Sequence, residues 1–168
     1  MPLRLPHTLT VTIDDRENIP YRFPESVTIS NSSSTVTAAV QTRSATIRTA
    51  DYRLDLFSNV CLVERKYSTS ELRNNLEESY VRSMAALDRL ANECMYPILT
   101  FDMSPSEMFR SDKYCPDPDN IVDRYLIECF KRGIHVLFLN GGTSDGSRRN
   151  AGKFLLHYIL VRAMKEMK

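Results

Sequence analysis

The sequence has no large excess of charge of either sign. Its 22 Lys and Arg residues nearly balance its 21 Asp and Glu residues, which leaves a formal net charge of +1 over 168 residues. A protein that holds nucleic acid by its overall charge is strongly basic, so any binding of a polyanion here must use a local patch. The balance therefore weighs against a purely electrostatic DNA binder and says little about an enzyme.

Cysteine and histidine motifs are also missing. No C-x-x-C pair occurs among the four cysteines, and the three histidines have no ligand-like spacing to them. A zinc site is therefore disfavoured. We expect Cys61, Cys94 and Cys129, which lie in apolar segments, to be small core residues of a reduced, intracellular protein.

Long apolar runs, repeats and nucleotide-binding loops are absent as well. No apolar span reaches the roughly 20 residues that cross a membrane, and no signal-peptide pattern is present, so membrane insertion and secretion are disfavoured. Gly152-Lys153 does not end a Walker loop, because Ser147 takes the place of the first glycine and Phe154 that of the Ser or Thr. Nucleotide hydrolysis is therefore disfavoured.

The composition that remains is that of an ordinary soluble globular protein, with 42% hydrophobic and 26% charged residues. The length suggests one domain over residues 1–168 with a proper core. Short apolar or alternating segments predict strands. These segments are Thr8–Ile13, Thr35–Gln41, Ala45–Thr49, Asp51–Leu56, Val60–Lys66, Ile98–Phe101 and Ile134–Leu139. We expect Tyr21–Ser34 to be irregular, with a loop tip at Asn31–Ser34.

Helix signals fill most of the second half. Ser68-x-x-Glu71 is a capping box, and the apolar spacing that follows it predicts a helix that ends near Glu93. Ser104-Pro105-x-Glu107 predicts a second helix start, and Ile121–Lys131 and Arg148–Met167 are predicted to be further helices. A β-rich first third followed by alternating helices and strands predicts an α/β fold with a mixed sheet.

Charged residues gather at the ends of predicted strands. Glu64 and Lys66 share one face of their strand, while Arg65 points the other way. The two strands that flank residues 57–59 form a plausible antiparallel hairpin, which brings Asp51 near this charged end. A surface cluster that ends a strand is the alternative explanation of the same residues.

Acids at neighbouring strand ends favour a site for a hard metal ion. If the strands lie side by side, Asp51, Glu64 and Glu17 converge on one edge of the sheet. Carboxylate oxygens with room for water and a phosphate oxygen describe a Mg²⁺ or Mn²⁺ site, and such an ion activates water and polarises a phosphoryl group. Lys66 would orient the water or stabilise charge on the phosphate, and Arg65 would pair with an acid or a phosphate. The residues thus make a phosphodiesterase one interpretation.

Four separate motifs occur in an order and spacing that resemble those of a known family. They are Asp14-x-Arg16-Glu17, Pro20-Tyr21-x-Phe23, Asp51-Tyr52 and Val63-Glu64-Arg65-Lys66. Over roughly residues 8–102 the chain resembles the XPF/Hef-type (xeroderma pigmentosum group F-like) nuclease domain in its stand-alone bacterial or phage version. The resemblance implies an α/β, restriction-endonuclease-like core with a central mixed β-sheet flanked by helices. It also implies a metal-dependent DNA endonuclease that hydrolyses phosphodiester bonds, with a preference for branched, flap or fork DNA in repair or recombination.

Carried over residue by residue, the resemblance implies Asp51 and Glu64 as ligands of Mg²⁺ or Mn²⁺ and Lys66 as the catalytic lysine. The supporting active-site residues that it implies are Arg16, Glu17 and Arg65. Glu17 is also a candidate third metal ligand.

Two positions depart from the family's pattern. Its glycine before Asp-Tyr is Ala50 here, which could tighten or shift that turn but leaves the carboxylate in place. The family also has an acid shortly after Glu-Arg-Lys, and Ser70 or Glu71 occupies that region here. Glu71 is therefore either a site residue or only the partner in a helix cap.

Several basic side chains are candidates for DNA contacts, with solvated helix faces as the alternative. They are Arg82, Arg89, Arg148, Arg149 and Lys153. The helix-hairpin-helix modules with which relatives grip duplex DNA are not visible, so the grip would come from the nuclease domain, a homodimer or a DNA-binding partner protein. A catalytically silent DNA-binding scaffold subunit and a restriction or junction-resolving type of nuclease are the alternative functions. The expected location is the cytoplasm, the nucleus if the chain is eukaryotic, or the host cell if it is viral.

Overall fold

The computed structural model describes residues 5–30 and 34–166. Within these residues the strands form one seven-stranded mixed sheet in the order β2-β3-β1-β4-β5-β6-β7. The strands are β1 (Thr8–Asp14), β2 (Ser26–Ser30), β3 (Thr35–Ala45), β4 (Tyr52–Leu54), β5 (Cys61–Lys66), β6 (Tyr96–Phe101) and β7 (His135–Phe138). β5, β6 and β7 run parallel to one another, while β4 is antiparallel to both β1 and β5. The predicted α/β fold with a central mixed sheet is confirmed.

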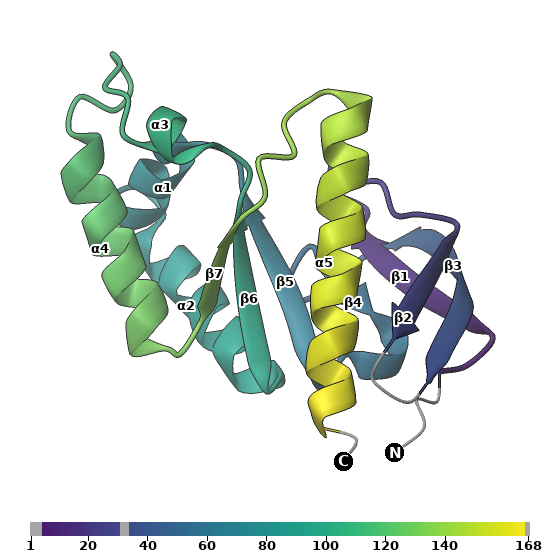
Figure 1. Cartoon of the computed structure of the whole chain (residues 1–168). Helices are drawn as coiled ribbons and strands as arrows, with labels where there is room; N and C mark the ends of the chain where they lie inside the picture. Colours follow the sequence, from purple (N-terminus) through teal and green to yellow (C-terminus); the bar gives the residue numbers. More distant parts are fainter. Residues whose placement is uncertain (1–4, 31–33, 167–168) are drawn as a thin grey trace.

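Helices pack against both faces of this sheet (Figure 1). They are α1 (Thr69–Leu76), α2 (Tyr80–Glu93), α3 (Pro105–Met108), α4 (Pro118–Lys131) and α5 (Asp145–Glu166), with a 3₁₀ helix at Asp55–Phe57. α5 packs on one face, and α1, α2 and α4 share a separate core with β5 and β6 on the other. No helix within the described ranges combines the length and the apolarity needed to cross a membrane.

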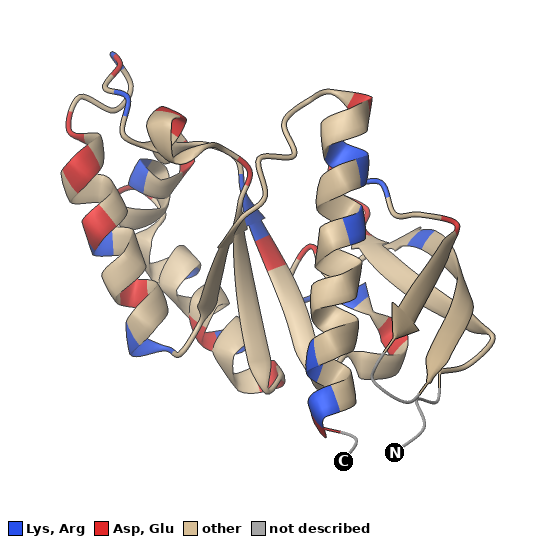
Figure 2. Ribbon diagram, viewed as in Figure 1, with Lys and Arg blue, Asp and Glu red and all other residues tan. Residues whose placement is uncertain are grey.

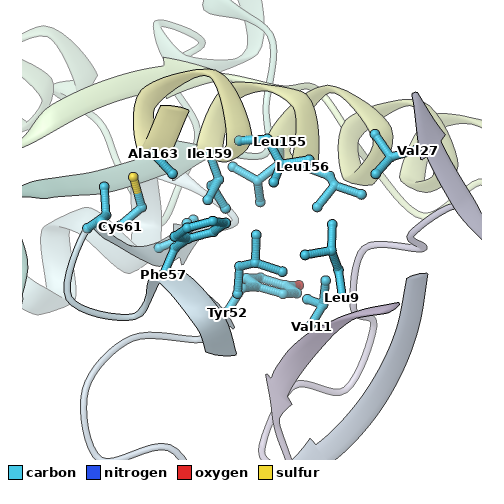
Figure 3. Close-up of a cluster of buried hydrophobic side chains, with 14 of the residues drawn as sticks. Leu9, Val11, Val27, Tyr52, Phe57, Cys61, Leu155, Leu156, Ile159 and Ala163 are labelled. Carbon is cyan, nitrogen blue, oxygen red and sulfur yellow. The ribbon is translucent and has the colours of Figure 1, made fainter. Parts of the chain in front are cut away.

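The core under α5 holds this helix against the first strands. Leu155, Leu156 and Ile159 of α5 point toward the sheet (Figure 3). They meet Leu9 of β1 and Tyr52 of β4, and all five side chains are buried. Burying each such side chain contributes roughly 1.5–3 kcal/mol of transfer free energy. The contact fixes α5 on the sheet and thereby places the loop that leads into it.

β5 runs between the two cores and divides its side chains between them. Val63 belongs to the core under α5, whereas Leu62 belongs to the core with α1, α2 and α4. Because side chains alternate along a strand, Glu64 and Lys66 lie on the same face of β5 as Leu62, and Arg65 lies on the same face as Val63. The predicted division of the Glu-Arg-Lys cluster between two faces of the sheet is confirmed by their partners.

The first third of the chain differs from the prediction in three ways. The stretch that we expected to be irregular contains β2, in which Val27 and Ile29 alternate into the core and which pairs with β3. The strand predicted at Thr35–Gln41 is β3 and extends to Ala45, because its parallel pairing with β1 continues that far. The strand predicted at Ala45–Thr49 is wrong, because residues 46–49 form irregular chain after the end of β3. Residues 31–33 of the expected loop tip lie outside the described residues.

The predicted hairpin is confirmed, although its first strand is short. Tyr52 of β4 faces Val63 of β5 in an antiparallel pair. β4 ends after three residues because the chain coils into the 3₁₀ helix at Asp55–Phe57. The last helix begins at Asp145, slightly earlier than predicted, and Met167 at its predicted end lies outside the described residues.

The single helix predicted from Ser68 to Glu93 is wrong, because the structure has two helices. Ser68 caps α1 as expected, since its hydroxyl accepts the N–H of Glu71 at 3.1 Å. After α1 the Ser79 N–H donates to the Asn74 carbonyl at 2.9 Å, a hydrogen bond that spans five residues instead of four. No glycine or proline marks this break, so the apolar periodicity did not reveal it. The bend separates α2 from α1 and lets both line one cleft.

Gly152 of α5 packs closely against the backbone of the segment between β1 and β2. A Cβ at this position would lie 2.3 Å from the carbonyl oxygen of Arg22. Gly152→Ala should therefore lower the free energy of unfolding by about 1–3 kcal/mol, because backbone has to shift. Gly146→Ala, where a Cβ meets nothing within 4 Å, should instead leave stability unchanged or raise it by up to about 1 kcal/mol. Urea unfolding of both variants makes the comparison, and equal effects would contradict the packing.

Candidate functional site

A cleft of about 430 Å³ opens beside the carboxyl end of β5. Three acids and one lysine line its floor. Glu64 and Lys66 come from β5, Asp51 directly precedes β4, and Glu71 comes from α1. Its basic residues are Arg16, Arg48, Arg82 and Arg89, and α1 and α2 add Asn74, Asn75, Ser79 and Ser83. Figure 2 shows the acidic and basic residues that follow one another at this end of β5. The structure thus brings together Asp51, Glu64 and Lys66, as the sequence predicted.

Asp51 is held in place by the hairpin. Its backbone N–H donates to the Val63 carbonyl at 2.8 Å, and its carboxylate accepts the backbone N–H of Arg65 at 2.7 Å. Burial, followed by repulsion from Glu64 and Glu17, raises the pKa of Asp51 to about 8. A carboxylate in this setting is destabilised by its surroundings and would be stabilised by a cation placed between it and Glu64.

Lys66 lies among carboxylates on the same floor. Its Nζ lies 2.8 Å from Oε1 of Glu64 and 3.2 Å from Oε1 of Glu71. Burial favours the neutral amine, but the neighbouring acids outweigh it and raise the pKa of Lys66 well above its usual value. Lys66 is therefore positively charged at neutral pH and acts as a hydrogen-bond donor.

Glu71 lies in the cap of α1 and also lines the cleft. Its backbone N–H is capped by Ser68, which is the structural role. Its carboxylate reaches the N–H of Tyr67 at 2.9 Å with one oxygen and Lys66 with the other. Glu71 thus begins a helix and also holds the lysine of the cleft.

Arg65 lies on the opposite face of β5 and is fully buried. Its guanidinium pairs with Asp102 and, at 3.1 Å, with Glu17. The rings of Tyr21 and Tyr67 lie 4.2 Å and 4.1 Å from the centre of the guanidinium, so the cation is also held between two aromatic faces. Arg65 is therefore a structural charge beside the site and is not exposed to a substrate.

Asp102 is the counter-charge that the sequence did not assign to Arg65. The backbone N–H groups of Gly141 and Gly142, in the loop that precedes α5, donate to its carboxylate. A Cβ on Gly141 would lie 2.5 Å from Asp102 and 2.6 Å from Tyr21, so this position requires glycine. Both N–H groups are therefore engaged inside the protein.

Glu17 lies on the Arg65 side. Its Oε2 accepts hydrogen bonds from the hydroxyls of Tyr52 at 3.1 Å and Tyr67 at 2.6 Å as well as from Arg65. Across the described residues no three His, Cys, Asp or Glu side chains are arranged to hold a metal ion. The expected convergence of Asp51, Glu64 and Glu17 as three ligands is thus not seen, and Glu17 serves Arg65 instead.

Arg16 joins the turn after β1 to the segment that carries Asp51. It makes a double hydrogen bond to Asp14 at 2.8 Å and 2.6 Å and reaches the Ile47 carbonyl at 2.9 Å. The hydrogen bond from Arg16 is the main cause that lowers the pKa of Asp14 to about 2. Arg48, which follows Ile47 and lines the cleft, was missed in the sequence because we placed it inside a strand.

The basic DNA-contact candidates divide into two groups. Arg82 and Arg89 line the cleft from α2. Arg148 and Arg149, at the start of α5, both pair with Asp145, at 3.2 Å and 3.1 Å, and neither lines the cleft. Lys153 is exposed on α5 and is likewise not part of the cleft.

Two of the three carboxylates of the cleft, Asp51 and Glu64, fit a hard divalent cation. Asp51 Oδ2 accepts a backbone N–H and Glu64 Oε1 contacts Lys66, which leaves Asp51 Oδ1 and Glu64 Oε2 without a partner among the described residues. Mg²⁺ commonly binds through one or two carboxylates and completes its coordination with water and phosphate oxygens. The donor set is therefore suited to Mg²⁺ or Mn²⁺ through Asp51 and Glu64.

Ala50, immediately before Asp51, has a positive φ of 78°. This left-handed conformation costs an L-residue other than glycine about 1–2 kcal/mol. Alanine offsets part of this cost relative to glycine, because it gives the unfolded chain less conformational entropy. Ala50→Gly should raise the free energy of unfolding by about 0.5–1 kcal/mol. Ala85→Gly, on the exposed face of α2, should lower it by about 1 kcal/mol. Chemical denaturation distinguishes the two, and a loss of stability in both variants would contradict strain at Ala50.

Comparisons with known proteins find similarity at the level of structure. No protein-family model matches the sequence, and the curated proteins contain no significant match. A solved structure of XPF from Aeropyrum pernix in complex with DNA aligns with a TM-score of 0.54 at 15% identity, covering 95% of this chain and 66% of that one. A second structure, of XPF from Aeropyrum pernix, aligns with a TM-score of 0.49 at 13% identity, covering 85% of this chain and 59% of that one.

The chain spans about three fifths to two thirds of the length of these two proteins. The alignment with the DNA complex extends over nearly the whole sheet and its helices, beyond the residues 8–102 that carry the motifs. Together with the order of the strands, it establishes the architecture that the four motifs implied. The chain therefore shares the fold of this XPF structure from Aeropyrum pernix, an α/β fold with a central mixed sheet flanked by helices.

Proposed function

We propose that the chain is a metal-dependent DNA endonuclease that hydrolyses phosphodiester bonds, with the cleft as its active site. The observation that carries the proposal is the grouping of Asp51, Glu64 and Lys66 on one floor, lined by arginines, at the carboxyl end of β5. The XPF-like fold supports it, and one of the similar structures was solved in complex with DNA.

Asp51 and Glu64 would hold the Mg²⁺ or Mn²⁺ ion through their unpaired oxygens. When bound, such an ion supplies Lewis acidity toward the phosphoryl group and lowers the pKa of water. The backbone N–H of Arg65 fixes the orientation of Asp51, so the carboxylate is in position before substrate arrives. The buried pairing of Arg65 keeps that N–H in place.

Lys66 contributes a positive charge to the same floor. Because its pKa is raised, Lys66 is a donor rather than a base, and it would donate to a phosphate oxygen or orient the attacking water. Glu71 and Glu64 hold its Nζ in the cleft. A donor that is already oriented toward developing negative charge stabilises the transition state more than the ground state.

The resemblance of the four motifs supports a finer proposal for the substrate. We place the activity on branched, flap or fork DNA, in repair or recombination inside the cell. A homodimer or a DNA-binding partner protein would add grip on the duplex arms. These features rest on the resemblance and need their own tests, for which flap, fork and linear DNA of one sequence serve as the substrates.

The substitution Glu64→Ala tests the assignment of the site. Cleavage with Mg²⁺ or Mn²⁺ should fall at least about 100-fold, because a metal-binding carboxylate is lost, and EDTA should abolish cleavage by the unaltered chain. Glu78→Ala, which removes an exposed acid outside the cleft, should cut at the normal rate. Gel assays measure the rates. Normal cleavage by the Glu64 variant would refute the site, and DNA binding without any cutting by the unaltered chain would favour a silent scaffold subunit.

A further inference from the structure

Three tyrosines have buried side chains, and the hydroxyl of one of them differs from the other two. Tyr21, Tyr52 and Tyr125 are each at most 1% exposed. The hydroxyl of Tyr21 donates to Thr100 at 3.3 Å, and that of Tyr52 donates to Glu17 at 3.1 Å. The hydroxyl of Tyr125 has no hydrogen-bond partner among the described residues. A buried tyrosine normally finds such a partner, because an unpaired buried hydroxyl is unfavourable, so Tyr125 needs an explanation.

The polar end of Tyr125 faces the cleft. Tyr125 comes from α4 and lines the cleft, although almost none of its side chain is exposed. Two other residues of the cleft, Thr49 and Asn75, each have an unpaired side-chain atom that is sealed from solvent, whereas the oxygen of Tyr125 is not sealed. The ring of Tyr125 packs in the core, edge-on to Phe101 with 6.4 Å between the ring centroids. The hydroxyl is therefore the part of this side chain that a ligand in the cleft can reach.

The Tyr125 ring lies beside Lys66. In the parallel pairing of β5 and β6, Lys66 is the register partner of Phe101, on which the Tyr125 ring packs. Burial raises the pKa of Tyr125 well above its usual value, and the positive charge of Lys66 offsets this only in part. The hydroxyl therefore keeps its proton at neutral pH and is available as a donor next to the lysine.

Lys66 has an unused donor of its own. An ammonium group carries three N–H donors. The Nζ of Lys66 lies 2.8 Å from Glu64 and 3.2 Å from Glu71, so two of its three N–H groups are engaged within the described part of the chain. One charged N–H and one neutral O–H thus remain unused at the same end of the cleft. Two such donors together suit a single anionic oxygen.

We infer that the hydroxyl of Tyr125 and the remaining N–H of Lys66 donate to the same non-bridging oxygen of the scissile phosphodiester, which makes Tyr125 a catalytic residue. The inference rests on the proposed nuclease function and adds to it a residue of α4, outside the four motifs. No bond to the hydroxyl is made or broken. The group only stabilises the negative charge on the phosphoryl oxygens, so it acts on kcat more than on binding.

The substitution Tyr125→Phe, in the full chain, removes the hydroxyl and keeps the ring that packs on Phe101. With Mg²⁺ and flap DNA, kcat should fall about 100-fold while KM stays unchanged, because removing one preoriented donor to a developing oxyanion typically has an effect of this size. Tyr114→Phe is the matched control, since it removes an exposed hydroxyl outside the cleft, and its kcat should be normal. A normal kcat for Tyr125→Phe, or an equal loss in the control, would overturn the inference.

The stability of the same variant separates a catalytic hydroxyl from a structural one. Tyr125→Phe should leave the midpoint of urea unfolding unchanged or raise it, because it removes a buried hydroxyl that has no partner. Tyr52→Phe should lower the midpoint, because its hydroxyl donates to Glu17 and accepts the N–H of Tyr21 at 3.0 Å. A loss of stability in Tyr125→Phe as large as that in Tyr52→Phe would mean that the Tyr125 hydroxyl serves the fold, and would overturn the inference.

A third measurement detects the contact without cleavage. In a chain labelled with 3-fluorotyrosine, the ¹⁹F signal that Tyr125→Phe removes belongs to Tyr125. The dinucleotide TpT is added together with Ca²⁺, a hard cation that binds the same type of oxygen ligand as Mg²⁺. The Tyr125 signal should shift, while the signal of the exposed Tyr114 should stay in place.

The ¹⁹F and cleavage results also distinguish the failure of this inference from that of the proposed function. A Tyr125 signal that does not move would overturn the contact with the phosphodiester, even if the unaltered chain cuts DNA. A signal that shifts in a chain that cuts no DNA would refute the proposed function and support the contact.

Discussion

The buried guanidinium of Arg65 is the constraint on which the candidate site depends. A charge with no access to water requires counter-charges. Asp102, which directly follows β6, and Glu17, which follows β1, supply them. Asp102 is held in turn by the loop that leads into α5. Removing one partner of such a buried pair typically costs about 3–5 kcal/mol, because the remaining charge is left uncompensated. Distant parts of the chain therefore meet at one point of the sheet edge.

The geometry of a β-strand connects this buried pair to the chemistry of the cleft. Because side chains alternate, fixing Arg65 on one face of β5 places Glu64 and Lys66 on the other. The backbone N–H of Arg65 at the same time fixes the carboxylate of Asp51. One residue thus stabilises the sheet edge with its side chain and orients a proposed metal ligand with its main chain. The unfavourable desolvation of the Arg65 guanidinium is thus coupled to a defined geometry of the Asp51 carboxylate.

The parts of the site that sequence could predict are those that follow from local rules. Alternation along β5 and a short hairpin were enough to bring Asp51, Glu64 and Lys66 together. The pairing of Arg65 with Asp102 could not be found in this way, because it depends on the parallel register of β5 and β6, whose residues are far apart in the chain. Arg48 was missed for a similar reason: the end of β3 is set by pairing with β1, not by the propensity of its own residues.

The break between α1 and α2 shows the same limit for the fold. Apolar periodicity continues across the break. The bend coincides with a hydrogen bond from the Ser79 N–H to the Asn74 carbonyl, which no residue type in the sequence predicts. The fold class and most elements follow from patterning, and the shape of the cleft follows from such non-local or unmarked contacts.

The central claim is that Asp51 and Glu64 form the binding site of one divalent cation beside Lys66. A crystal soaked in Mn²⁺ and measured at the manganese absorption edge tests it most directly, because anomalous scattering locates the ion without reference to activity. One anomalous peak in contact with both carboxylates is expected. A peak elsewhere on the molecule, or none between these two residues at saturating Mn²⁺, would contradict it.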